Sequence, residues 1–258
     1  MSSSRKKLLI GNWKCNGTLD ENAKRTDGMI EGLKAVELKN LEVFVAPTMM
    51  HLGQVAAKAK GSKLGVCAQN VSANPCGAFT GEVSATQLRD AGIPWAIAGH
   101  SERRQSEKMQ TFESNKIVAL KVAASIDASL SVCVCVGETE AERKENKTTT
   151  VIEEQLAAVL PVVKDWSKFA VAYEPLWAIG TGNTATKEQA QEVHAHIRKY
   201  VAGAVGEEVA AGLRICYGGS VKPKNSGELI AMKDIDGFLV GGASLKADSY
   251  LAIVKSMV

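Results

Sequence analysis

The sequence lacks any apolar run approaching the roughly 20 residues that a membrane-spanning helix needs. It also lacks a strong charge imbalance, since the formal net charge is only +3. That charge is too small to indicate a nucleic-acid partner, although it suits a small anionic substrate. The opening stretch MSSSRKKLLIGNWKC carries basic residues, but no signal-peptide core follows them. We therefore expect a cytoplasmic protein with neither a membrane nor a nucleic-acid partner.

The six cysteines are scattered along the chain, and several lie inside apolar runs such as SVCVCV. This placement favours buried free thiols in a reducing compartment over a disulfide framework. Cys133 and Cys135 are two residues apart on a predicted strand, and we expect their thiols to face opposite sides, which would argue against a metal pair. No metal site is predicted.

Short apolar runs recur along the chain at a regular interval. They are rich in valine and isoleucine, and most lack clean alternation, which is typical of parallel strands that are buried on both faces. The eight runs are 8–13, 41–47, 63–70, 95–100, 131–137, 169–175, 213–219 and 237–242.

Helix-like stretches lie between most of these runs, for example at 19–36, 112–128 and 186–205. In the last of them the apolar residues follow the spacing of one helical face, and Thr186 is in a position to cap it. Eight strand–helix units in a chain of this length predict an α/β fold, namely a (β/α)8 barrel forming a single domain over residues 1–258. An open doubly wound sheet is the alternative, but no Gly-x-Gly-x-x-Gly motif opens the first helix.

The barrel prediction places the functional site, because active sites of such barrels lie at the carboxyl ends of the strands. An amide, a lysine, a histidine and a glutamate stand at strand ends there: Asn12, Lys14, His100 and Glu174. Glycine pairs follow the last two runs, at 218–219 and 241–242, where such barrels often bind phosphate.

Each of these residues also has a purely structural interpretation. Glu174 could be an ion-pair partner, Lys14 a solvated charge and His100 a hydrogen-bonded structural histidine. The functional interpretation rests on all of the sites falling on one rim.

Several longer stretches resemble the triosephosphate isomerase family. They occur in the order that the family has them and extend over nearly the whole chain. They are GNWKCNG (11–17), GAFTGE (77–82), GHSERR (99–104), CVGET (135–139), YEPLWAIGTG (173–182), YGGSVKP (217–223) and DGFLVGGASL (236–245).

The resemblance implies an enzyme of glycolysis and gluconeogenesis that interconverts dihydroxyacetone phosphate and glyceraldehyde 3-phosphate through an enediolate, without metal or cofactor. The family is an established example of tuned acid–base groups and of loop closure. It implies Glu174 as the base and His100 as a neutral electrophile beside a helix start. Lys14 would supply positive charge and Asn12 a neutral donor. Three residues would support these four: Ser101, Glu102 and Cys135.

The resemblance also implies how phosphate binds and what covers it. Phosphate would be bound by Asn12 and Lys14 and by the backbone of Gly180, Ser220, Gly241 and Gly242. A lid would cover the bound substrate. Its hinge would be Pro175, Leu176 and Trp177, and the hinge would be followed by Ala178, Ile179, Gly180, Thr181 and Gly182. Within it, Trp177 would need an apolar resting place, and Ile179 would cover Glu174 and exclude water.

A homodimer is a further implication of the resemblance. The loop at about 71–84 would project into the partner and place its tip, which includes Phe79 and Thr80, beside Asn12 and Lys14. Cys15 would lie under that tip.

Two stretches depart from the family pattern. The end of the lid reads Asn-Thr-Ala at 183–185, where many relatives have lysine first. After GHSERR the chain has a few extra residues and no Gly-Glu. The conformation of 105–114 therefore does not carry over.

Two other functions fit parts of this pattern. A Schiff-base aldolase on the same fold would use Lys14 as a nucleophile. A binding protein without catalysis would lack the base or the electrophile, and both are present.

Overall fold

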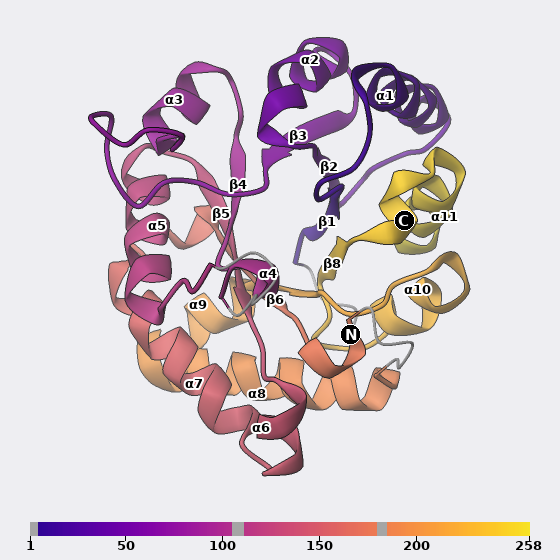
Figure 1. Ribbon diagram of the computed structural model, residues 1–258. Coiled ribbons are helices and arrows are strands. Elements are labelled where there is room, and N and C mark those ends of the chain that lie inside the picture. Colours follow the sequence, from indigo (N-terminus) through magenta and orange to yellow (C-terminus); the bar gives the residue numbers. More distant parts are fainter. Residues whose placement is uncertain (1–4, 105–110, 180–184) are drawn as a thin grey trace.

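The computed structural model describes residues 5–104, 111–179 and 185–258, which form a closed ring of parallel strands surrounded by helices (Figure 1). Each strand pairs in parallel with the next, and β1 pairs with β8 to close the barrel. The strands are β1 (Lys7–Asn12), β2 (Leu41–Ala46), β3 (Leu64–Ala68), β4 (Trp95–Ala98), β5 (Ser131–Val136), β6 (Phe169–Tyr173), β7 (Arg214–Tyr217) and β8 (Gly237–Val240). The prediction of a (β/α)8 barrel is confirmed.

The α-helices cover the outside of this barrel, apart from short segments at its rims (Figure 1). They are α1 (Leu19–Lys34), α2 (Met49–Ala59), α3 (Ala85–Asp90), α4 (Ser101–Arg104), α5 (Asn115–Asp127), α6 (Glu140–Lys144), α7 (Thr148–Val159), α8 (Lys187–Val205), α9 (Glu207–Gly212), α10 (Pro223–Ile230) and α11 (Ala247–Met257). Four 3-10 turns add η1 (Leu160–Val162), η2 (Trp166–Lys168), η3 (Leu176–Ala178) and η4 (Gly242–Leu245).

The start of α8 shows how the local sequence determines where a helix begins. Thr186 accepts a hydrogen bond from the Gln189 N–H, and the Gln189 side chain accepts one from the Thr186 N–H. This reciprocal capping satisfies two backbone donors that the helix itself leaves unpaired, so the predicted cap is confirmed. The apolar face of α8 then packs against the barrel through Ala190, Ile197 and Val201, which are fully buried.

Two hydrophobic clusters divide the buried side chains. The larger one lies between the barrel and its helices, and the smaller one fills the barrel interior. Cys133 and Cys135 both belong to the interior cluster. The expectation that they face opposite sides was wrong, because side chains two residues apart in a strand point to the same side. Burial raises the pKa of Cys135 well above its usual range, so this thiol stays protonated.

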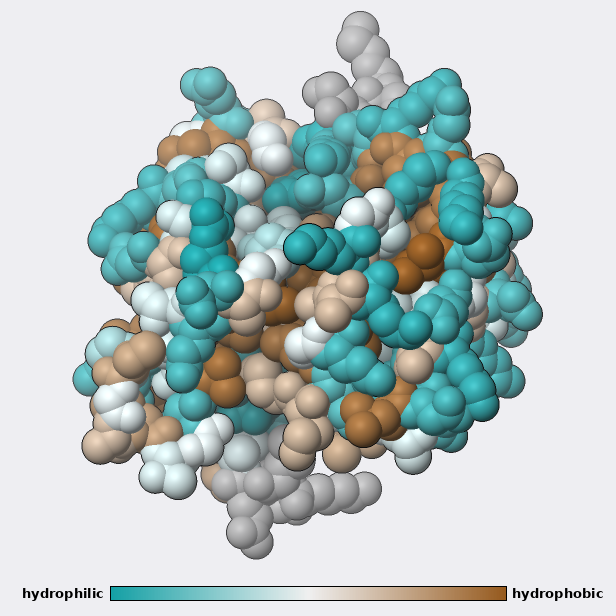
Figure 2. Space-filling model, turned by 90° about the horizontal axis from the view of Figure 1, so that it is seen from above, coloured by the Kyte–Doolittle hydropathy of each residue, from teal (hydrophilic) through white to brown (hydrophobic). Residues whose placement is uncertain are grey.

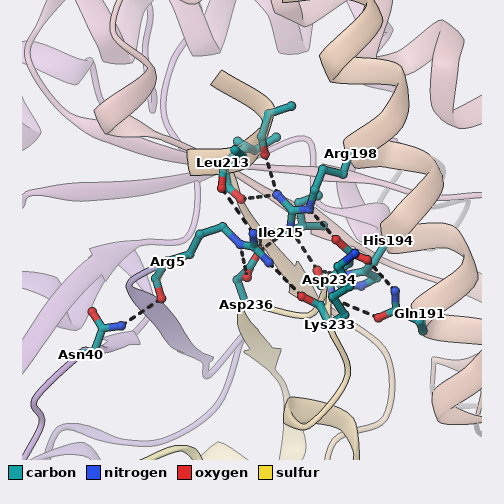
Figure 3. Close-up of polar contacts among 12 residues, drawn as sticks. Arg5, Asn40, Gln191, His194, Arg198, Leu213, Ile215, Lys233, Asp234 and Asp236 are labelled. Atoms are coloured by element: carbon teal, nitrogen blue, oxygen red, sulfur yellow. Dashed lines mark hydrogen bonds and ion pairs between the residues drawn. The ribbon is translucent and has the colours of Figure 1, made fainter. Parts of the chain in front are cut away.

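A network of charged residues connects the first and last strands at the amino-terminal end of the barrel (Figure 3). Arg198 on α8 donates to Asp234 and Asp236, at 2.6 Å each. Arg5, just before β1, donates to the other oxygen of Asp236 at 2.6 Å. Because Asp236 directly precedes β8, its two ion pairs link the β1–β8 junction to an outer helix, away from the carboxyl ends of the strands.

The face of the molecule seen in Figure 2 is mostly hydrophilic, and its hydrophobic residues lie among polar ones. None of the helices in the described part of the chain is long and apolar enough to cross a bilayer.

Candidate active site

A cavity of about 660 Å³ lies at the carboxyl ends of the strands. The structure brings together there most of the residues predicted to act on a substrate. They are Asn12, Lys14, His100, Glu174, Ile179, Ser220, Gly241 and Gly242.

Glu174 directly follows β6 and is almost completely buried. One carboxylate oxygen accepts the Ser101 N–H at 2.8 Å, and the other lies 3.0 Å from His100 Nε2. Burial raises the pKa of Glu174. The His100 imidazole and the hydrogen bond from the Ser101 N–H lower it by a larger amount, so the net shift of the pKa is downward. The carboxyl is therefore ionised and held by both partners.

His100 ends the segment after β4, and its two ring nitrogens have different partners. Nδ1 accepts the Glu102 N–H at 3.2 Å, which leaves Nε2 as the protonated nitrogen facing Glu174. Burial lowers the pKa of His100, and the Glu174 carboxylate more than offsets this, so the net shift is upward. Lys14 also lowers the pKa of His100, and Glu102 raises it.

Lys14 lies just beyond β1 with a backbone φ of 52°, which is unusual for a residue with a side chain. Two contacts stabilise this conformation: its N–H donates to Asn12 Oδ1 at 3.0 Å, and its carbonyl accepts from Gln69 Nε2 at 2.9 Å. The Lys14 ammonium forms an ion pair of 2.7 Å with Glu102 at the cavity wall. Strain of this kind is characteristic of functional positions. Sequence reasoning missed Gln69, which follows β3 without any distinctive motif.

Glycines at the ends of β7 and β8 also line the cavity, beside Lys14 and Glu174. Gly241 precedes the 3-10 turn η4, and a β-carbon there would lie 3.5 Å from Lys14 Cε. A β-carbon at Gly218 would lie only 2.9 Å from Glu174 Cγ. Backbone therefore lines this wall closely, as an anion site requires. Gly180, the remaining predicted phosphate-binding residue, lies outside the described residues.

The three predicted supporting residues all neighbour this site. Ser101 and Glu102 begin α4 and contact Glu174 and Lys14 as described above. The helix start expected beside His100 is therefore present. Cys135 on β5 is buried near Glu174, whose negative charge adds to the burial that raises the thiol pKa.

The segment 175–179 leaves β6 through the 3-10 turn η3, and its Ile179 lines the cavity together with Glu174. Trp177 has polar partners that the sequence did not predict. Its indole Nε1 donates to the buried carboxylate of Glu138 at 3.0 Å, and Arg143 lies 4.2 Å over its ring. A tryptophan has a polar edge that seeks a partner when buried, which the earlier expectation neglected. Thr181 and Gly182 of the predicted lid lie outside the described residues.

Glu113 lies in the stretch after GHSERR, which lacks the Gly-Glu pair of the family pattern. It is buried and accepts from Arg103 and, at 2.6 Å, from Lys121. Its N–H donates to the Arg103 carbonyl at 3.0 Å. The extra residues before Glu113 made its place relative to the family pattern hard to predict. Ser114, the next residue, caps α5, and this capping signal would have placed Glu113 just before that helix.

A profile of the triosephosphate isomerase family matches residues 7–257 of the chain. The chain belongs to the triosephosphate isomerase family. Among its relatives named triosephosphate isomerase, that of Prosthecochloris aestuarii is 48% identical over 98% of both chains. That of Coprinopsis cinerea is 49% identical over 95% of this chain and 96% of its own, and that of Aspergillus oryzae is 50% identical over 94% and 95%.

The triosephosphate isomerase match spans all eight strands, so it includes every cavity residue described above. The residues predicted at a subunit contact are on the surface: Cys15 and Thr80 are exposed, and Phe79 exposes 41% of its side chain. Within the described ranges, no group of three or more potential metal ligands occurs.

Proposed function

We propose that this protein interconverts dihydroxyacetone phosphate and D-glyceraldehyde 3-phosphate through an enediolate intermediate. The observation that carries this function is the meeting of Glu174, His100 and Lys14 at one cavity lined by backbone glycines. The reaction moves a carbon-bound proton and develops negative charge on oxygen, so it needs a base, a donor and a cation together.

Each residue has a separate role in this reaction. Glu174 removes the proton from substrate carbon and returns it to the neighbouring carbon. His100, neutral and protonated on Nε2, donates to the substrate oxygens. Lys14 stabilises the oxyanion and the phosphate, and Asn12 both donates to the substrate and orders Lys14.

The phosphate lies against the backbone of Ser220, Gly241 and Gly242 in this proposal, and Gly180 adds an N–H from the lid. A 3-10 turn begins at Gly242, and the first N–H groups of a helix have no partner within it. Ile179 covers Glu174, and excluding water there raises the basicity of the carboxylate.

A Schiff-base aldolase is the less favoured alternative. Lys14 would need a free amine to attack a carbonyl carbon. Its side-chain nitrogen instead forms a 2.7 Å ion pair with Glu102. Borohydride treatment with substrate separates the two reactions, because it would trap Lys14 covalently only in an aldolase.

A coupled assay with glyceraldehyde 3-phosphate tests the proposed function. We expect formation of dihydroxyacetone phosphate without added metal and in the presence of a chelator. Absence of turnover in the folded protein would contradict the proposal.

We also propose a cytoplasmic homodimer in which the tip containing Phe79 and Thr80 packs beside Cys15 of the second subunit. Reaction of Cys15 with a methanethiosulfonate should then overpack the contact and shift Lys14 next to it. Activity and dimer should be lost together, as enzyme assays and sedimentation would show.

The structure makes Cys76 the necessary control for this prediction, because it is the other exposed thiol among the described residues. Hydrogen bonds with Ser84 and Thr86 lower the pKa of Cys76, which favours its reaction. Cys15→Ala should resist inactivation, whereas Cys76→Ser should be inactivated as fast as the unmodified sequence. Equal sensitivity of Cys15→Ala, or a modified protein that stays dimeric and active, would refute the proposal.

A further inference from the structure

The cavity that contains Glu174 extends past the glycines after β7 and β8. Lys222 and Lys246 follow those glycines in the chain and also line the cavity, and Ser249 adds a hydroxyl to the same wall. The whole cavity measures about 660 Å³, a size typical of sites for drug-sized ligands. A three-carbon monophosphate is much smaller than such a ligand, so it leaves part of this cavity unfilled.

Lys222 and Lys246 each stand directly before a helix. Lys222 precedes α10, and Lys246 precedes α11. These two helices lie side by side (Figure 1), and a hydrogen bond of 2.8 Å joins Ser256 on α11 to Ser226 on α10. The two lysines therefore reach the same cavity from neighbouring helices.

Lysine is an unfavourable residue at the start of a helix. The amino end of a helix carries partial positive charge, and its free N–H groups need an acceptor, which a lysine side chain does not have. Thr18, Ser84 and Thr186 supply such an acceptor to their own helices. Neither Lys222 nor Lys246 forms a side-chain capping hydrogen bond. Helix stability therefore does not explain either lysine.

The charges of Lys222 and Lys246 are not compensated in the part of the chain that the structure describes. Both residues are exposed, and neither has an ion-pair partner there. The two carboxylates that line the same cavity already pair with Lys14 and His100. Asp248, in the first turn of α11, is exposed and does not line the cavity. This end of the cavity therefore attracts an anion.

We propose that Lys222 and Lys246 form a second anion subsite, so that the cavity binds small organic molecules with two phosphate groups in preference to those with one. This inference rests on the proposed function, because the first phosphate occupies the backbone site described there. The second phosphate pairs with both lysines, which bind phosphate as point charges, and accepts a hydrogen bond from the Ser249 hydroxyl. A bisphosphate bound in this way occupies the place of the substrate and competes with it.

The experiment measures by calorimetry the binding of bisphosphates of straight-chain terminal diols, from propanediol to hexanediol, each against the monophosphate of the same diol. The two compounds of a pair have the same carbon chain and differ only in the second phosphate. At the best chain length the bisphosphate should bind about 10-fold more tightly than the monophosphate, as expected for two exposed ion pairs. The preference should decrease as salt is added, because exposed charges are screened. The same bisphosphate should inhibit isomerisation competitively.

Substitution of the lysines tests whether they cause this preference. Lys222→Gln and Lys246→Gln should each reduce it to about 3-fold, and the double variant should abolish it, whereas Lys246→Arg keeps the charge and should keep the preference. Lys147 is the matched control. It is exposed and directly precedes α7, but it pairs with Glu145 at 2.6 Å and does not line the cavity. Lys147→Gln removes the same charge from the protein and should leave the preference at about 10-fold.

Three results would overturn the inference. They are equal affinity for the two compounds of every pair, a preference that persists in the double variant, and an equal loss of affinity for both compounds in the variants of Lys222 and Lys246. The last result would mean that these lysines only attract phosphates in general. Failure of the proposed function is distinguishable, because the unmodified protein would then show no isomerisation, whereas failure of this inference leaves isomerisation and monophosphate binding intact.

Discussion

Glu174→Gln should lower kcat about 1,000-fold, within the range by which general bases accelerate reactions. Glutamine keeps the shape of the side chain and its contact with the Ser101 N–H, but it cannot accept a proton from carbon. Substrate binding should change much less, because Lys14 and the glycine wall of the cavity are retained. Steady-state measurement of kcat and KM would separate the two effects.

Glu42→Gln provides the comparison for this result. Glu42 also forms an ion pair, with Arg214, but it lies at the opposite end of the barrel. The Glu42→Gln variant should therefore retain the kcat of the unmodified protein. Turnover by Glu174→Gln close to that of Glu42→Gln would show that Glu174 is not the base.

The fold could be predicted because parallel strands buried on both faces form continuous apolar runs. All eight runs became strands, and their ends located the cavity because strand ends in a barrel share one rim. Asn12, Lys14, His100 and Glu174 were found in this way, since each stands at or just beyond a strand. Position along the chain was therefore sufficient for the residues that line the rim.

Residues whose side chains reach the site from another part of the chain were harder to predict. Gln69 reaches back to Lys14, and Arg143 reaches Trp177 from a separate helix. Such contacts depend on rotamers and on the packing of elements distant in sequence, which no local pattern encodes. The contacts of the Trp177 indole with a buried carboxylate and a guanidinium were not predicted for this reason.

Gly137→Ala should lower kcat about 100-fold without removing any functional group. Gly137 follows β5, and a β-carbon there would lie 1.8 Å from the Glu174 carbonyl oxygen and 2.7 Å from its carbonyl carbon. Neither backbone can give way easily. Gln155 pairs with both the N–H and the carbonyl of Gly137, at 2.8 and 3.0 Å, and the Glu174 N–H donates to Val136 at 2.7 Å.

The extra methyl should therefore displace Glu174 by a fraction of an ångström or more, and small misplacements of a reacting group cost about 100-fold in rate. Overpacking should also reduce the free energy of unfolding by about 1–3 kcal/mol. Gly237→Ala separates the two effects, since its β-carbon would lie 1.9 Å from the Leu8 carbonyl oxygen at the amino-terminal end of β8. We expect a comparable loss of stability there, measured by denaturant unfolding, with kcat unchanged in the folded protein. If Gly137→Ala loses stability but keeps kcat, the close contact with Glu174 does not set the position of the base.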